Sequence, residues 1–182
     1  AGALGEGGLV VDVPDMLEDL WDARPQIPMT PITTLDVATF GGRSREEKIS
    51  WLRKWMLLEG VDRVLLTSLD EIAWMLNVRG SDIEYNPLVI SYLLVSQDSV
   101  RWFVRKGMTD DPDTLDSFSE LEMDDVAVDD YDAVFFGLSD FSEEQSPVTL
   151  FVDPSTLNHH LYSYIMDSYP SDRIVCGTSP VI

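Results

Sequence analysis

From residue 69 to residue 87 the chain reads Leu69-Asp70-Glu71-Ile72-Ala73-Trp74-Met75-Leu76-Asn77-Val78-Arg79-Gly80-Ser81-Asp82-Ile83-Glu84-Tyr85-Asn86-Pro87. The first half predicts a helix, because Ile72, Met75 and Leu76 fall on one face at helical spacing. Ser68 and Glu71 have the spacing of a capping box at its start. The second half predicts a polar turn that Pro87 closes, because proline disfavours helix in the residue before it.

Polar side chains crowd around Gly80 in this turn, namely Arg79, Asp82, Glu84 and Asn86. Arg79 is a fixed cation that can bind a carboxylate through two hydrogen bonds, so the turn is the one concentration of residues that suggests a functional site. A structural interpretation stands beside it. Arg79 and Asp82 would then pair with each other or cap neighbouring elements, and Gly80 would be a turn residue with positive φ.

The sequence around this stretch alternates between helical and strand patterns. Upstream, Ser44 and Glu47 predict a second capping box for a helix over 46–59, which Gly60 ends, and a strand follows over 61–67. The inward residues of that helix are Ile49, Leu52, Trp55 and Met56. Downstream, an apolar run over 88–95 predicts a buried strand.

The rest of the chain continues this alternation. We predict strands over 100–104, 126–128, 148–152 and 174–176, with helices in 109–125, over 131–141 and from Pro154 onward. The turn over 97–99 joins two strands closely enough to make them antiparallel. Together these elements predict a three-layer α/β/α sandwich around a mixed sheet of about five or six strands.

The N-terminal part differs in composition from the rest. It suggests a short strand over 9–13 and a helix that begins near Pro14, followed by a proline-rich connector. We therefore expect residues 1–24 to be the tail end of a preceding domain and 25–40 to be a linker. Residues 41–178 would form the main domain, and 179–182 would begin a linker to a further domain. The start at Ala1 without Met suggests a piece of a longer protein.

Charge and cysteine content narrow the classes of function. The 182 residues include 33 acidic and 12 basic side chains, a net charge of −21, which argues against nucleic-acid binding through phosphates. Basic protein partners remain compatible with this charge, although a solvated acidic surface is its commoner cause. The single cysteine, Cys176, excludes an internal disulfide framework. Neither a membrane span nor a signal peptide is visible in the sequence, so we expect a cytoplasmic location without membrane partners.

No catalytic or metal-binding set emerges from the residue types. His159 and His160 are adjacent on a helix, so they point in different directions and cannot easily reach one site. The acidic run over 110–113 lacks the glycine and the terminal glutamate of a calcium loop. The glycines over 5–8 precede a possible strand, whereas a phosphate-binding loop follows one. We thus predict no catalytic residue, no metal ligand and no cofactor in this chain.

Several sequence motifs of this chain resemble those of a known family. Residues 69–74, 77–83, 86–87 and 91–92 closely resemble the middle domain of the long, three-domain form of aminopeptidase P, the Xaa-Pro aminopeptidases. Other landmarks follow in the family's order over 20–25, 42–53 and 179–181. The resemblance covers nearly the whole chain and is weakest between residues 105 and 170.

The resemblance implies a fold, an activity and a metal for the parent protein. Family members are metallopeptidases that remove an N-terminal residue preceding proline, usually with two manganese ions. Their metal ligands lie in a C-terminal "pita-bread" domain, and no segment of this sequence matches those motifs. The N-terminal domains of the wider creatinase/prolidase family have a ribonuclease-H-like sheet, assist oligomerisation and wall off the substrate entrance. We therefore expect this chain alone to be inactive on Xaa-Pro peptides.

The resemblance also gives the polar turn a role. Asn77, Arg79, Asp82, Tyr85 and Asn86 would dock the catalytic domain of the parent protein and shape the mouth through which the peptide substrate enters. Without that domain, the charges of the turn would lack some of their partners. The alternative is a non-catalytic binding module for basic protein partners, similar to the aminopeptidase-like domain of a histone chaperone.

Overall fold

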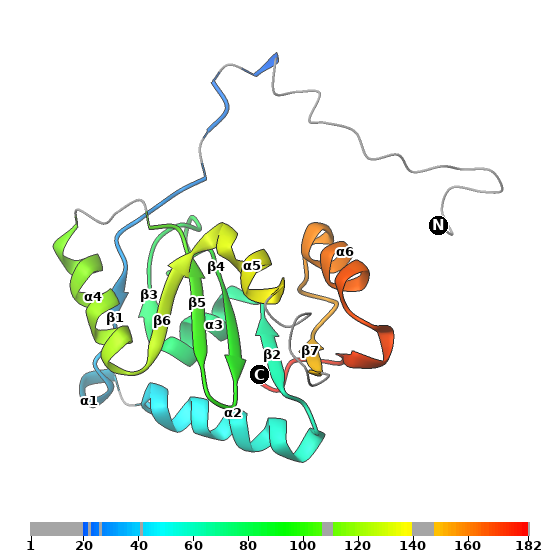
Figure 1. Cartoon of the computed structure of the whole chain (residues 1–182). Helices are drawn as coiled ribbons and strands as arrows, with labels where there is room; N and C mark the ends of the chain where they lie inside the picture. Colours follow the sequence, from blue (N-terminus) through cyan, green and yellow to red (C-terminus); the bar gives the residue numbers. More distant parts are fainter. Residues whose placement is uncertain are drawn as a thin grey trace.

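The structure is a computed structural model that describes residues 20–21, 23–25, 27–40, 42–106, 111–139 and 148–181. Its centre is a mixed six-stranded sheet in the order β6-β5-β4-β2-β7-β8 (Figure 1). The strands are β2 (Arg63–Leu66), β4 (Ser91–Ser96), β5 (Val100–Val104), β6 (Val126–Asp130), β7 (Leu150–Val152) and β8 (Ile174–Cys176). The β4 strand is antiparallel to both β2 and β5, while the outer pairs β5–β6, β2–β7 and β7–β8 are parallel.

Helices cover both faces of this sheet. One apolar cluster joins one face to helices α2 (Arg45–Glu59), α3 (Leu69–Leu76) and α4 (Pro112–Met123). A second cluster joins the other face to α5 (Val134–Ser139) and α6 (His159–Ser168). Short helical elements in the described residues also include α1 (Val37–Phe40) and the 3₁₀ turns η2 (Tyr131–Ala133) and η3 (Ser171–Arg173). The predicted sandwich with a mixed sheet is confirmed.

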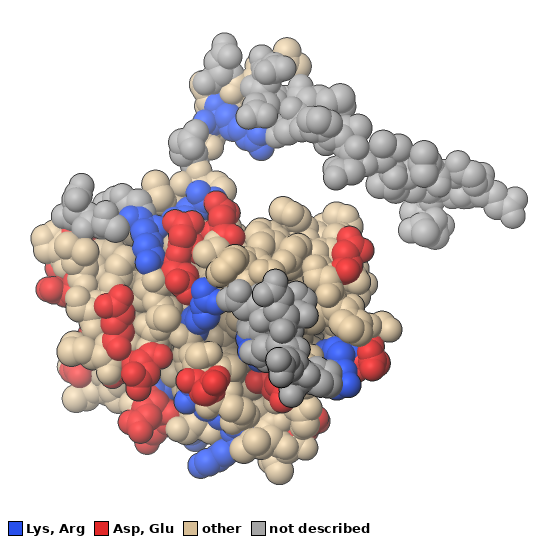
Figure 2. Space-filling view, viewed as in Figure 1, with Lys and Arg blue, Asp and Glu red and all other residues tan. Residues whose placement is uncertain are grey.

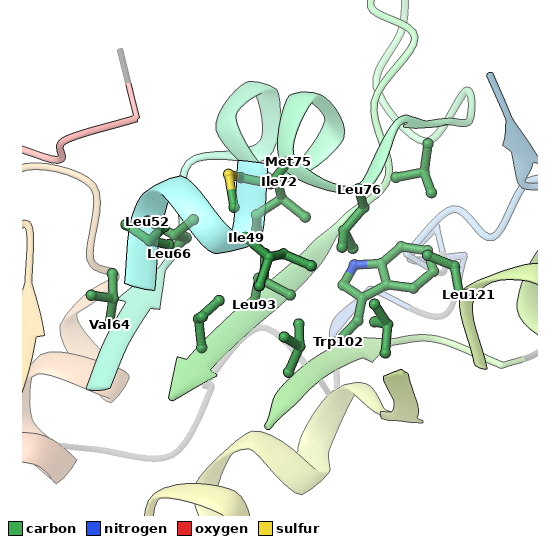
Figure 3. Close-up of a cluster of buried hydrophobic side chains, with 14 of the residues drawn as sticks. Ile49, Leu52, Val64, Leu66, Ile72, Met75, Leu76, Leu93, Trp102 and Leu121 are labelled. Atoms are coloured by element: carbon green, nitrogen blue, oxygen red, sulfur yellow. The ribbon is translucent and has the colours of Figure 1, made fainter. Parts of the chain in front are cut away.

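Strand alternation assigns the central side chains to the two layers. In β5, Trp102 and Val104 belong to the first cluster and Phe103 to the second. Figure 3 shows Trp102 beside Leu76 and Leu121, so strand, α3 and α4 meet in one core. All three of these side chains are fully buried. Parallel pairs form both edges of the sheet, while the antiparallel strands β4 and β2 lie at its middle.

Several helix boundaries and caps in the structure differ from those predicted from the sequence. The last helix begins at His159, because Asn158 caps it and residues 154–156 form a turn, so the predicted start at Pro154 is wrong. The capping box at Ser44 is present, with Glu47 completing it. The predicted box at Ser68 is wrong, because the Ser68 hydroxyl donates to Asp70 and makes no cap hydrogen bond. The predicted strand over 9–13 and most of the helix near Pro14 lie outside the described residues.

Part of the expected linker is joined to the main body. Thr33–Thr34 forms β1, which pairs antiparallel with β3 (Val78–Arg79). Ile32 is buried, its amide donates to Thr114 Oγ1 at 2.9 Å, and its carbonyl accepts from Ser117 at 3.0 Å. Residues 30–34 therefore pack on α4 and the turn after α3 instead of bridging two bodies. The division of the chain into domains otherwise stays a prediction.

Candidate functional site

The polar turn connects α3 to β4 and is held at its base by backbone geometry. Asn77 ends α3 in the left-handed conformation, with φ 54°, which asparagine tolerates better than most residues. A Cβ atom on Gly80 would lie 2.7 Å from Val89 Cγ2. Gly80 is thus required by this close approach and not by a positive φ, which corrects one sequence-based interpretation. The turn leaves a rigid helix end and passes tightly against the start of the next strand.

Arg79 points back to the helix that precedes it. Its Nη1 donates to the carbonyl oxygens of Ala73 at 3.0 Å and Val78 at 2.7 Å. The last carbonyls of a helix lack intrahelical partners and carry partial negative charge, so a guanidinium there is stabilising. Arg79 therefore caps α3, as the structural interpretation predicted. No ion pair joins Arg79 to Asp82 among the described side chains.

Two buried cations of α2 reach the same helix end. Lys48 Nζ donates to the carbonyl of Trp74 and to Asn77 Oδ1, and it lies 4.5 Å from the centroid of the Trp74 ring. Arg45 Nε donates to the carbonyl of Leu76. Burial, together with the neighbouring charges of Arg79 and Arg45, lowers the pKa of Lys48 to about 8. Three cations thus converge on the carbonyl end of α3.

Arg45 and Lys48 are not among the site residues that the sequence predicts. They lie three residues apart on the helix face that also carries Ile49 and Leu52, and both are nearly fully buried. The sequence signal that could have identified them is a charged residue at a helical position that faces the core. Arg45 additionally pairs with Glu120 at 2.7 Å and with Asp124, so it links α2 to α4 as well.

Asp82 binds two distant parts of the chain. Its Oδ1 accepts from the amide of Thr30 at 2.9 Å and from its hydroxyl at 2.7 Å. Its Oδ2 accepts from the amide of Ile90 at 2.9 Å. A carboxylate that accepts several such bonds is well satisfied without a cation. The expectation that the turn's charges would lack partners is wrong for Arg79 and Asp82, because backbone groups supply them.

The tip of the turn behaves differently. Tyr85 is 94% exposed and has φ 65°, a left-handed conformation that is uncommon for an aromatic residue. Asn86 and Glu84 are exposed beside it, and a surface hollow is lined by Ser81 and residues 83–87. A bridge between Ile83 and Asn86 closes the loop. The five predicted site residues therefore divide: Asn77, Arg79 and Asp82 face inward, and Tyr85 and Asn86 face solvent.

A second polar cluster lies at the other end of α3. Ser179 donates through its hydroxyl to Glu71 Oε2 at 2.8 Å and through its amide to Asp153 Oδ2 at 2.9 Å. Burial raises the pKa of Glu71, and the neighbouring Asp70 and Asp153 add to this effect. Hydrogen bonds from Ser155 and the Ser179 amide lower the pKa of Asp153. Residues 179–181, expected to begin a linker, are thus bound to the domain. From the sequence, Ser179 belongs only to the family landmark over 179–181, because no local pattern indicates its distant partners Glu71 and Asp153.

The described residues hold no group of three or more histidine, cysteine or acidic side chains placed to bind a metal ion. His159 and His160 are both exposed, and the ring of His160 lies 4.6 Å from that of Phe135. None of the helices in the described ranges combines the length and the apolar composition that a membrane-spanning segment requires.

Comparison with known proteins identifies similar sequences and folds. The sequence pattern of the Creatinase/Prolidase N-terminal domain matches residues 23–182. The chain is 35% identical to a probable Xaa-Pro aminopeptidase P of Laccaria bicolor over 129 residues, which are 70% of this chain and 19% of that protein. It is 30% identical to aminopeptidase P2 of Arabidopsis thaliana over 145 residues, covering 79% of this chain and 19% of that protein.

A solved structure shows the same fold in a larger enzyme. The X-prolyl aminopeptidase of Caenorhabditis elegans, described as a cytosolic enzyme with a di-nuclear active site, superposes with a TM-score of 0.78 and 28% identity. The match covers 94% of this chain and 27% of that protein. The chain thus spans about a fifth to a quarter of the length of these relatives.

Proposed function

This chain belongs to the creatinase/prolidase N-terminal domain family, and we propose on that premise that it is the non-catalytic middle domain of a metal-dependent Xaa-Pro aminopeptidase. In this proposal it docks the catalytic domain of its parent protein, supports a homo-oligomer and forms part of the wall where the peptide substrate enters. The parent enzyme would be cytoplasmic and would use two manganese ions held by its catalytic domain. The described residues offer no ligand set for that metal, so no step of hydrolysis is assigned to them.

The exposed Tyr85 is the observation that carries this proposal. A left-handed tyrosine is strained, and such strain persists where the surroundings enforce it, often at functional sites. Asp82 and the close packing of Gly80 hold the loop base in place. A tyrosine that is 94% exposed on a loop with a fixed base is suited to insert into a partner surface, where tyrosine is often a main contributor to binding.

Kinetics of the full-length parent protein test this role. We expect Tyr85→Ala to reduce kcat/KM for Xaa-Pro peptides by about tenfold or more. This corresponds to a loss of about 1.4 kcal/mol or more in interaction free energy, which is usual when a main interface residue is truncated. Tyr162→Ala is the matched control, because Tyr162 is 40% exposed on α6, on the other face of the sheet. Wild-type kinetics in the Tyr85 variant, with an intact fold, would contradict the docking role.

The isolated chain provides a second readout. We expect no cleavage of Xaa-Pro peptides by the 182-residue chain with added manganese, because water activation requires a metal centre. Manganese-dependent cleavage by this chain would overturn its assignment as a non-catalytic domain.

The alternative of a binding module for basic protein partners has no observation in its favour. The two curated relatives described above are named as aminopeptidases, and the solved structure is that of an X-prolyl aminopeptidase. On the face that Figure 2 shows, acidic side chains form several separate groups with lysine and arginine between them. This arrangement is typical of a solvated surface.

A further inference from the structure

We propose that Glu71, Asp153 and Ser179 form a clasp that sets the direction in which the polypeptide leaves this domain, so that the domain that follows is positioned against the Trp51–Trp55 side of α2. This inference rests on the proposed function in one respect, namely that a domain follows residue 182. The three side chains act as positioning residues and take no part in chemistry.

The clasp joins three elements that are distant in the sequence. Glu71 lies in the first turn of α3, Asp153 directly follows β7, and Ser179 lies in the exit segment, defined here as residues 177–181. Ser179 is 7% exposed, so its two hydrogen bonds are shielded from water. The Val181 amide donates in turn to Ser179 Oγ at 3.3 Å. The hydroxyl of one serine therefore serves both the domain and the chain that leaves it.

Packing guides the exit segment along one side of the molecule. The Gly177 amide donates to the carbonyl of Val152 at 3.2 Å, and a Cβ atom on Gly177 would lie 3.0 Å from the Phe151 ring. The Phe151 ring meets that of Trp55 edge to face, with ring centroids 5.0 Å apart. Val181 packs against the same apolar cluster as Trp51 and Trp55.

The α2 side next to this path is apolar and only partly covered. Trp51, Trp55 and Leu58 follow one another at helical spacing, and Leu58 is 86% exposed. Trp51 and Trp55 are half-buried. Half-buried tryptophans beside an exposed leucine are suited to an interface, and the approach of Gly177 to Phe151, whose ring meets that of Trp55, brings the exit segment next to this row. The occupant that we assign is therefore the next domain of the same polypeptide.

Hydrogen exchange on the 182-residue chain tests the clasp itself. We expect Ser179→Ala and Glu71→Ala to accelerate exchange of the Val181 amide by about tenfold, the effect of losing one hydrogen bond to a charged group. Glu71→Gln retains an acceptor and should leave exchange near the wild-type rate. Asp70→Ala is the matched control, because Asp70 is a carboxylate of the same helical turn that binds Ser68 instead. Unchanged Val181 exchange in the two clasp variants, with β4 amides still protected, would overturn the clasp.

Oxidative footprinting tests the assigned surface. We expect Trp51 and Trp55 to be labelled severalfold less in the full-length parent protein than in the 182-residue chain, and Ser179→Ala to restore part of that labelling. Tyr162, on the opposite face, should be labelled equally in both. Equal labelling of the two tryptophans in both proteins would overturn the surface. Neither readout requires peptidase activity, so failure of the proposed function and failure of this inference are separable.

Discussion

Arg79 and Asp82 lie close together in the sequence but serve different parts of the fold. Arg79 binds the Ala73 carbonyl of α3 and the adjacent Val78 carbonyl, while Asp82 binds Thr30 and the amide of Ile90. Their residue types showed that the turn was chemically special. Which partners they bind was not readable from the sequence, because Thr30 reaches Asp82 only after the chain has folded.

The contacts of Asp82 lead to a stability prediction. We expect Asp82→Ala to lower the free energy of unfolding by about 2–3 kcal/mol, because three donors lose their acceptor in a partly buried site. Urea denaturation of the 182-residue chain measures this change. Glu84→Ala removes an exposed carboxylate from the same loop and should change the free energy by less than about 0.5 kcal/mol. Equal effects of the two substitutions would show that Asp82 does not hold the loop.

At the scale of elements, α3 is unusual in how its ends are satisfied. Its predicted N-terminal capping box is absent, and Glu71 binds Ser179 instead. Its carbonyl end receives Arg45, Lys48 and Arg79. In α2, by contrast, local capping signals were sufficient, since the Ser44 box and the helix end at Gly60 are both as predicted. Local signals therefore predicted the capping of α2 and failed for α3, whose end groups bind residues distant in the chain.

Lys48 makes the stability of this arrangement dependent on pH. Its pKa of about 8 in the folded chain lies below the usual 10.5, so the unfolded chain binds more protons between these values. The free energy of unfolding should therefore gain a contribution that rises with pH from about 8 to 10, by at most about 1.4 kcal/mol per pH unit. The cations facing Lys48 are Arg45 on its own helix and Arg79 on β3.

Denaturation curves of two variants across this pH range isolate the effect. We expect Lys48→Met to flatten the rise, because it removes the titrating group. Lys54→Met, at an exposed position of the same helix, should retain the rise. A slope that persists unchanged in the Lys48 variant would assign the pH dependence to other groups.

At the scale of the whole molecule, the segment before α2 is an integral part of one layer. β1 pairs with β3, and Ile32 belongs to the same apolar cluster as α2, α3 and α4. The polar turn is therefore enclosed between an N-terminal strand and the hairpin β4–β5. Within the turn, the tip around Tyr85 and Asn86 stays exposed to solvent, and it is the part that we propose contacts a partner domain.

Ile27 and Ile32 both lie within the expected linker. Substituting each one tests whether that part of the chain is a loose connector or is packed on the domain. We expect Ile32→Ala to lower the free energy of unfolding by about 2–4 kcal/mol, because Ile32 is buried. Ile27→Ala should have an effect within about 0.5 kcal/mol, because Ile27 is 48% exposed. Thermal or urea denaturation of both variants measures the difference. A negligible effect of the Ile32 substitution would restore the linker interpretation for that position.

The sequence by itself determined the order and type of most elements, the sandwich class and the location of the polar turn. These properties depend on short-range patterns, such as the helical spacing of Ile72 and Met75 or the apolar run before Ser96. Only the tertiary structure decided that Lys48 reaches the end of α3, that Asp82 binds Thr30 and that Ser179 binds Glu71. Each of these contacts joins residues far apart in the chain. A side chain's spacing in sequence constrains its neighbours within a few helical turns, whereas long-range partners are set by how the layers pack.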